Sequence, residues 1–218
     1  MPQAARASWD RAIGDLDRLP PDRGAEVAFV GRSNSGKSSA INAITGLKHL
    51  AYVSRTPGRT QSINFFGWGP NRRLVDLPGY GYAAVPARQT RLWAMLISPY
   101  LQTRASLRGL VLVMDARHPF MERDRLLLEW AAPLKRPVLV LLTKSDKLGR
   151  QQALRALELG RATLASVYPH GGGIQLFSAT SGLGVASARA AIMRWLEAGK
   201  KIPRLKGSKT GGKCLNKD

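Results

Sequence analysis

The eight residues from Gly31 to Ser38 have the types and spacing needed to bind a chain of phosphate groups. They read Gly-Arg-Ser-Asn-Ser-Gly-Lys-Ser, and the glycines let the backbone curl until successive N–H groups point at phosphate oxygens. Lys37 can reach the β- and γ-phosphates, and the Ser38 hydroxyl can coordinate Mg²⁺. The predicted phosphate ligands are therefore Gly31, Arg32, Ser33, Asn34, Ser35, Gly36, Lys37 and Ser38.

Two further segments could serve the same phosphates and metal. Asp76-Leu77-Pro78-Gly79 offers a carboxylate that can hold Mg²⁺ through a water molecule, and its Gly79 N–H can meet the γ-phosphate. The loop around Thr60 offers a hydroxyl that can bind the metal, with Thr56 as the alternative. The residues expected near the nucleotide in these segments are Gly58, Arg59, Thr60, Gln61, Ser62, Asp76, Leu77, Pro78 and Gly79.

Asp146 and its neighbours indicate which base the nucleotide carries. In Thr143-Lys144-Ser145-Asp146, the Asp146 carboxylate can accept hydrogen bonds from N1–H and the 2-amino group of guanine, whereas adenine has neither donor. The Lys144 stem can lie over the plane of the base, and a backbone N–H near Ala179 can contact the guanine O6. The predicted base-binding residues are Thr143, Lys144, Ser145, Asp146, Phe177, Ser178 and Ala179.

The elements that must position these motifs alternate between strands and helices. Apolar runs typical of buried strands lie at residues 27–30, 62–68, 72–76, 110–115, 138–143 and 174–177. Helical spacing covers 37–46, 88–104, 121–134, 150–167 and 183–198, and Pro99 is expected to bend or break the second helix. This alternation predicts an α/β fold with a mostly parallel six-stranded sheet and helices on both faces. Only the edge pair joined by Gly69-Pro70-Asn71 should be antiparallel, because that connection is too short for a crossover.

Composition points to a polyanionic partner. The chain has 218 residues with 34 Lys+Arg against 14 Asp+Glu, a formal net charge of +20, and this balance favours nucleic acid or a particle built on it. We expect three parts: an extension over residues 1–22 with a helix at 7–18, a domain over 23–198, and a flexible tail over 199–218. The tail carries seven Lys and Arg against one acid.

Several classes of protein are excluded. The single cysteine, Cys214, cannot form an internal disulfide, and no clustered Cys/His pattern offers a zinc site. The apolar runs are too short to cross a bilayer, and the N-terminus lacks the apolar stretch of a secretory signal. We expect a cytoplasmic protein without membrane association and, since no DNA-reading motif is present, without sequence-specific DNA binding.

Together these motifs resemble the EngB (YihA/YsxC) family of GTP-binding proteins, within the Era/EngA/YihA group of translation-factor-type GTPases. The matching runs are Glu26 to Asn34, Gly36 to Ser39, Thr56 to Thr60, Ile63 to Phe66, Asp76 to Ala83, Asp115 to His118 and Thr143 to Lys147. The resemblance spans residues 24–198 and implies a P-loop GTPase fold that binds GTP and GDP with Mg²⁺. It also implies a role in assembling the large ribosomal subunit, in contact with rRNA and ribosomal protein, and in normal septation during cell division.

The residue after Gly79 bears on catalysis. Ras-like GTPases place there a glutamine that orients the attacking water, and this chain has Tyr80, which cannot orient water in the same way. We therefore expect slow hydrolysis by a switch that associates transiently with the ribosome in its GTP state, and the group that activates the water stays open. Asn34 is also a candidate K⁺ ligand, as the equivalent asparagine is in related GTPases.

Two other interpretations stay open at this point. A P-loop ATPase or small-molecule kinase is disfavoured by Asp146, and a preference for ATP over GTP would restore it. A basic RNA-binding module with a vestigial nucleotide site is disfavoured because Lys37, Ser38, Asp76 and Asp146 are all intact.

Overall fold

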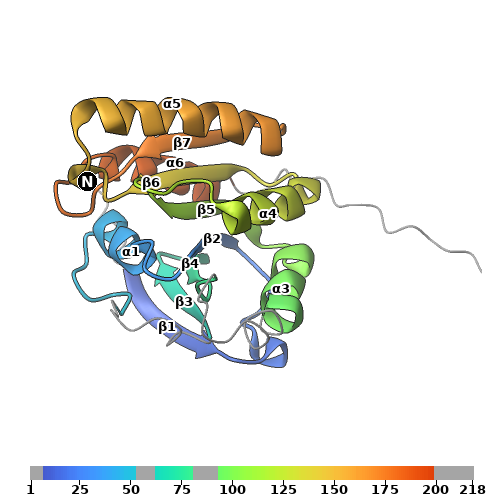
Figure 1. Ribbon diagram of the computed structural model, residues 1–218. Coiled ribbons are helices and arrows are strands. Elements are labelled where there is room, and N and C mark those ends of the chain that lie inside the picture. The colour runs from blue at the N-terminus through green and yellow to red at the C-terminus, as the bar shows by residue number, and fades with distance from the viewer. Residues whose placement is uncertain (1–6, 53–61, 81–92, 199–218) are drawn as a thin grey trace, which may run out of the picture.

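The computed structural model describes residues 7–52, 62–80 and 93–198, and within these ranges one seven-stranded sheet runs through the molecule in the order β1-β3-β4-β2-β5-β6-β7 (Figure 1). The strands are β1 (Ala7–Ile13), β2 (Ala25–Gly31), β3 (Ile63–Trp68), β4 (Arg72–Asp76), β5 (Leu107–Asp115), β6 (Val138–Thr143) and β7 (Gly172–Leu176). The α-helices are α1 (Lys37–Thr45), α3 (Ser98–Thr103), α4 (Glu122–Ala131), α5 (Arg150–Val167) and α6 (Val185–Glu197). Shorter helical turns are η1 (Leu16–Arg18), η2 (Trp93–Ile97), η3 (Ala132–Leu134) and η4 (Ser145–Lys147).

β1 is the strand that the sequence did not predict. The helix expected over residues 7–18 is wrong, because Ala7–Ile13 is extended and pairs antiparallel with β3. An unpaired β3 edge would leave a row of backbone donors and acceptors without partners, and pairing with β1 satisfies them. The sheet therefore has seven strands instead of six, and β1, β3 and β4 form a run of antiparallel neighbours at one edge.

The remaining predicted elements form close to their expected positions. α1 ends at Gly46, whose left-handed φ of 75° suits a helix terminus. The helix expected over residues 88–104 is described from residue 93 onward, where η2 changes into α3. Pro99 lies in the first turn of α3, where its missing N–H would have had no partner within that helix.

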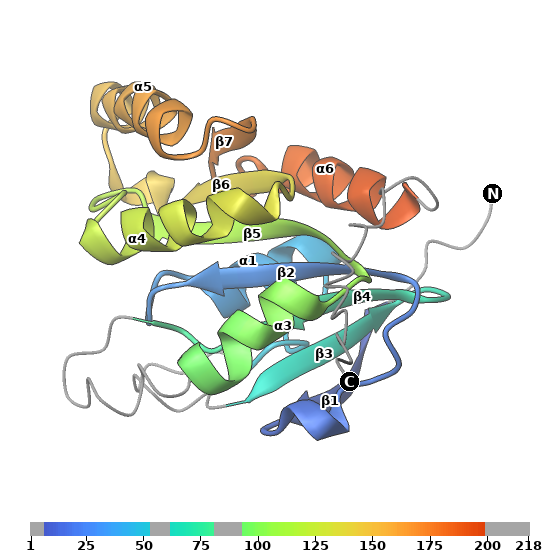
Figure 2. The same cartoon turned by 90° about the vertical axis from the view of Figure 1, so that its right-hand side faces the viewer.

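Helices cover both faces of the sheet, and each face has its own buried core. In Figure 2, α3 and α4 lie in front of the central strands, while α1 and α6 lie behind them. One core contains Tyr100 of α3, Leu128 of α4 and Leu164 of α5, and the other contains Ile41 of α1 and Ile192 of α6. β2 and β6 are buried along their whole length, as expected for parallel strands covered on both sides. No helix in the described ranges is long and apolar enough to cross a membrane.

Candidate nucleotide-binding site

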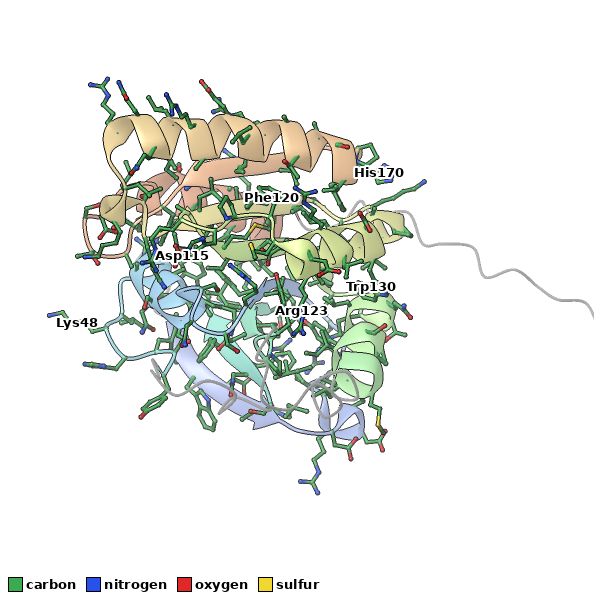
Figure 3. All side chains as sticks on the ribbon, viewed as in Figure 1. Lys48, Asp115, Phe120, Arg123, Trp130 and His170 are labelled. Carbon is green, nitrogen blue, oxygen red and sulfur yellow. The ribbon has the colours of Figure 1, made fainter. Side chains whose placement is uncertain are left out.

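Four neighbouring strands end at one edge of the sheet and bring the predicted motifs together. β4, β2, β5 and β6 lie side by side and end at Asp76, Gly31, Asp115 and Thr143. The carboxyl ends of parallel strands meet at the same edge, which is where such sheets bind ligands. Asp115 lies at this edge, near α1 (Figure 3). The phosphate loop, the Asp76–Gly79 segment and the base motif therefore converge on one site.

The phosphate loop curls between β2 and α1. Asn34, with φ 64°, and Gly36, with φ 90°, adopt left-handed backbone conformations. Gly31 has no room for a side chain, because a Cβ there would lie 2.5 Å from the Val113 carbonyl oxygen. Since α1 begins at Lys37, the loop presents the free N–H groups and positive dipole end of that helix to a bound phosphate.

Lys37 and Asp76 form a buried ion pair between the phosphate loop and the end of β4. Their side chains are only 9% and 6% exposed, and a charge buried to this degree needs an opposite charge beside it. Each side chain has the chemistry for a different part of the ligand: the ammonium suits phosphate and the carboxylate suits hydrated Mg²⁺. A magnesium-bound nucleotide can therefore supply a substitute partner to both side chains at once.

The oxygen donors beside Lys37 fit Mg²⁺. This ion is usually held by one or two protein oxygens together with phosphate and water, and Ser38 in the first turn of α1 and Asp76 at the end of β4 provide a hydroxyl and a carboxylate. In the described part of the chain, no group of three or more His, Cys, Asp or Glu could hold a metal. Of the predicted switch-loop ligands, Ser62 directly precedes β3, and Gly58, Arg59, Thr60 and Gln61 lie outside the described residues.

Thr143 and Lys144 tie the base motif to the phosphate loop. The Thr143 hydroxyl lies 2.5 Å from the Ser35 carbonyl oxygen and 2.9 Å from the Met114 carbonyl oxygen, and its one proton can be shared between them. The Lys144 ammonium donates to the Asn34 carbonyl oxygen at 2.8 Å. These contacts fix the distance between the parts of the site predicted to bind phosphate and base.

Asp115 ends β5 and lies in the run Asp115 to His118 that resembles the EngB family, but the sequence predicted no site role for it. Its carboxylate lies 2.7 Å from Arg117 Nη2 and 3.0 Å from Lys144 Nζ. Burial raises the pKa of Asp115, but hydrogen bonds from Arg117 and Lys144 lower it by more, so the net pKa is well below its usual value. The ionised carboxylate anchors Lys144 beside the phosphate loop. The available signal was its position at the carboxyl end of a predicted strand.

Ser178 orients the carboxylate of Asp146, the residue predicted to read the base. The Ser178 hydroxyl donates to Asp146 Oδ1 at 2.6 Å, and the Ser181 N–H donates in turn to the Ser178 oxygen at 3.1 Å. The hydrogen bond from Ser178 is the main cause that lowers the pKa of Asp146. The side chain stays 20% exposed, so an ionised acceptor is held in place while part of it faces solvent.

Several predicted site residues support the site from inside. Ser35, Leu77, Ser145 and Phe177 are buried. The Leu77 N–H donates to the Phe29 carbonyl at 3.0 Å. The Ser145 hydroxyl donates to the Phe177 carbonyl at 2.9 Å, which joins the two segments predicted to bind guanine. These buried side chains shape the site.

Ser178→Ala is expected to weaken GTP binding about tenfold, because a hydrogen bond to a charged group contributes about 1.5 kcal/mol. It should also change the pH dependence. Guanine binding by the Asp146 carboxylate is lost as the pH falls through the pKa of Asp146, and removing the Ser178 hydroxyl raises that pKa. Affinity in the variant should therefore decline at a higher pH. GTP titrations across the acidic range measure this shift, and an unchanged midpoint would contradict the assigned role of Ser178.

The site defines a class of protein. The phosphate loop joins β2 to α1, and an Asp-x-x-Gly segment follows β4, the neighbour of β2. A Lys-x-Asp motif follows β6, which lies two strands from β2 on the other side. These parts in this order make the chain a P-loop GTPase. A family model described as a 50S ribosome-binding GTPase matches residues 26–144.

Curated relatives narrow the assignment. The chain is 52% identical to the probable GTP-binding protein EngB of Azoarcus sp. (strain BH72), over 90% of this chain and 94% of that protein. It is 48% identical to the protein of the same description from Nitrosomonas europaea, over 91% of this chain and 89% of the relative. The chain belongs to the EngB family of GTP-binding proteins, and it is a GTP-binding GTPase.

Solved structures confirm the fold. The crystal structure of a probable GTP-binding protein EngB covers 79% of this chain and 98% of its own, with a TM-score of 0.63 and 22% identity. A variant of Era from Aquifex aeolicus bound to GDP·AlF4⁻ gives a TM-score of 0.64 at 23% identity, over 82% of this chain and 58% of its own. The ATPase, kinase and vestigial-site interpretations are not supported by this family membership.

Proposed function

We propose that the chain is a Mg²⁺-dependent GTPase switch that acts in assembling the large ribosomal subunit and is needed for normal septation. The family model's description as a 50S ribosome-binding GTPase supports this partner class. In this proposal the phosphate loop and Gly79 bind the phosphates, while Ser38, Thr60 and a water on Asp76 hold the metal. Residues 143–146 and 177–179 bind guanine. The protein works in the cytoplasm and associates transiently with the ribosome.

The observation that best supports a ribosomal RNA partner is a group of basic residues at one edge of the sheet. We call this group the basic edge, and it consists of Arg23, Arg108, Lys135 and Arg136. Arg23 precedes β2, and Lys135 and Arg136 precede β6, at the edge of the sheet opposite the nucleotide site. Leu110 of β5 lies opposite Val138 of β6. Arg108 and Arg136 are two positions before these residues, and the charge of Arg108 acts on Arg136. Within the described ranges these four side chains take part in no ion pair.

The basic edge has a like-charge contact that an anion would relieve. Burial and then the charge of Arg108 lower the pKa of Arg136, although Asp22 and Tyr168 oppose this effect. The Arg108 Nε is buried and has no hydrogen-bond partner among the described groups. An RNA phosphate placed here would gain charged donors from neighbouring strands, which supports rRNA as the contacted surface.

The helix that precedes the basic residues 199–218 ends close to the same edge. α6 ends at Glu197, whose carboxylate lies 3.4 Å from the Arg72 guanidinium at the start of β4. Residues 199–218, with seven Lys and Arg, follow directly. We propose that they extend the basic edge as an RNA-contacting segment appended to the GTPase domain.

Neutralising part of the basic edge is expected to weaken binding to large ribosomal subunits. Arg23→Gln with Lys135→Gln removes two exposed charges, so the affinity should fall about tenfold and the salt slope by about two. Arg155→Gln with Arg161→Gln removes two exposed charges from α5 and serves as the matched control. Sedimentation with subunits at two salt concentrations, with GDP and with a GTP analogue, measures both pairs. If both double variants lost the same affinity for subunits, or if binding did not depend on the nucleotide, the attraction would be nonspecific and electrostatic, and the proposed role of the basic edge would be wrong.

We propose that intrinsic hydrolysis is slow because Tyr80 occupies the position of the water-orienting glutamine, and that a ribosomal partner completes the catalytic site. Asn34 is exposed at the tip of the phosphate loop, where a K⁺ ion could share its contacts with the phosphates. Turnover measured in KCl and in NaCl, with and without large subunits, tests both parts of this proposal.

A further inference from the structure

The backbone of Tyr80 is bonded directly to the phosphate loop. The Tyr80 N–H donates to the Gly31 carbonyl at 3.2 Å, and the Ser33 N–H donates to the Tyr80 carbonyl at 2.9 Å. Arg32 and Tyr80 are therefore paired as neighbours in a short parallel bridge. Gly79 packs against the same loop, because a Cβ on Gly79 would lie 3.1 Å from Ser33 Oγ. The position of the Gly79 N–H thus depends on how Tyr80 is held.

The Tyr80 side chain is held by Asp124 of α4. Tyr80 is 6% exposed and Asp124 is fully buried, and the Tyr80 hydroxyl donates to Asp124 Oδ1 at 2.7 Å. The other carboxylate oxygen accepts from the Met121 N–H at 3.0 Å and lies 3.6 Å from Arg32 Nε. We call Tyr80, Asp124 and Arg32 the Tyr80 latch. It joins the segment after Asp76, the phosphate loop and the start of α4.

The buried carboxylate of Asp124 favours one position of the Tyr80 side chain. Burial raises the pKa of Asp124, whereas the hydrogen bond from Tyr80 and the charge of Arg32 oppose that rise. If Tyr80 moved away, Asp124 would lose one of its few donors while still shielded from water, which is costly. The Asp124 carboxylate is therefore most stable when Tyr80 is in this one position. Because Gly79 is bonded to Tyr80 through the backbone, Gly79 is held in one position as well.

We propose that Asp124 and Tyr80 are positioning residues for γ-phosphate recognition, because the Tyr80 latch holds the Gly79 N–H over the phosphate loop before GTP binds. This inference rests on the proposed contact between Gly79 and the γ-phosphate. A site that is already arranged does not lose affinity to the ordering of a mobile segment. GDP has no γ-phosphate, so the latch acts on the affinity for GTP and leaves the affinity for GDP unchanged.

The chain contains a second cluster of the same chemistry that serves as a matched control. The Tyr100 hydroxyl donates to Glu26 Oε2 at 2.9 Å, and Arg104 Nη2 lies 2.7 Å from Glu26 Oε1. Tyr100 and Glu26 are both fully buried. This cluster lies at the amino ends of β2 and β5, away from the phosphate loop. Removing its tyrosine hydroxyl has a comparable structural cost without touching the latch.

The test compares Tyr80→Phe with Tyr100→Phe, using calorimetric titration with GDP and with a non-hydrolysable GTP analogue in the presence of Mg²⁺. Tyr80→Phe is expected to lower the ratio of GTP-analogue affinity to GDP affinity about fivefold, with the GDP affinity kept. Tyr100→Phe should leave this ratio unchanged, although both variants lose thermal stability. An unchanged affinity ratio in Tyr80→Phe, or an equal decrease of the ratio in both variants, would contradict the proposed role of the Tyr80 latch.

Two further variants separate the latch from the contact on which it rests. Asp124→Asn removes the negative charge, and with it the attraction to Arg32 and the strong hydrogen bond that the Tyr80 hydroxyl donates to a carboxylate. It should therefore also lower the ratio, and adding Tyr80→Phe should change it little further. Gly79→Ala should lower the ratio because its Cβ presses on Ser33. If Gly79→Ala lowers it and the latch variants do not, the latch is wrong and the Gly79 contact stands. If Gly79→Ala has no effect, the Gly79 contact fails and the latch fails with it.

Discussion

Lys37→Ala is expected to reduce the affinity for GTP and GDP by at least about a hundredfold. The variant removes the Lys37 ammonium, which we propose contacts the β- and γ-phosphates, and such charge-assisted contacts are the strong ones. It also leaves Asp76, 4% exposed, as a buried carboxylate without its ion-pair partner. Breaking a buried pair in this way costs about 3 kcal/mol. Nucleotide titration and urea unfolding of the nucleotide-free protein measure the two effects separately.

A double variant distinguishes the binding role of Lys37 from its structural role. Lys37→Ala with Asp76→Ala removes both charges, so the unfolding free energy should recover much of what the single variant loses. Nucleotide binding should stay lost, because neither the phosphate ligand nor the metal ligand is restored. A double variant no more stable than Lys37→Ala would show that the two side chains are not energetically coupled.

Asp146→Asn is expected to lower GTP affinity about a thousandfold and to create affinity for xanthosine triphosphate. In the proposed site the carboxylate accepts two hydrogen bonds from guanine, and an amide would set its NH₂ group against one of those donors. Xanthine carries an oxygen where guanine has its 2-amino group, so the same amide then finds an acceptor. The amide can also still accept a hydrogen bond from Ser178, which keeps the local structure intact.

Competition titrations with the guanine, xanthine and adenine triphosphates measure this change in specificity. Thermal unfolding without nucleotide is the control, and it should change little because the amide oxygen still accepts the hydrogen bond from Ser178. Full GTP affinity in the variant would show that guanine is recognised by other groups. A loss of GTP affinity without any gain for the xanthine nucleotide would show that Asp146 supports the loop and does not read the base.

The sequence predicts the phosphate loop and its flanking elements well because their causes are local. Gly31 and Gly36 mark positions that need close approach or positive φ, and the apolar run before them indicates a buried strand. The same holds for the hairpin at Gly69-Pro70-Asn71, where turn residues separate two short strands. Each of these signals depends on residues within a few positions of one another, so no tertiary information is needed to read it.

The features that the sequence did not predict depend on distant partners. Residues 7–13 become a strand because β3 offers an open edge, which helical spacing within the segment cannot reveal. Asp124 lies in no motif, and the matching run that contains Asp115 assigns that residue no role. Their roles arise from Tyr80 and Lys144, which are far away in the chain. Tertiary contacts override local preference in the first case and assign function in the others.

The pairing of β1 with β3 sets the order in which the sheet can be completed during synthesis. Ile13 lies opposite Ile63, about fifty residues later in the chain, so β1 leaves the ribosome before its partner strand and must wait for it. The β3–β4 hairpin closes locally, whereas β1 has to cross a long loop, and such nonlocal pairings form slowly. Until residue 68 has emerged, Trp9 and its neighbours in β1 have no partner strand with which to pair.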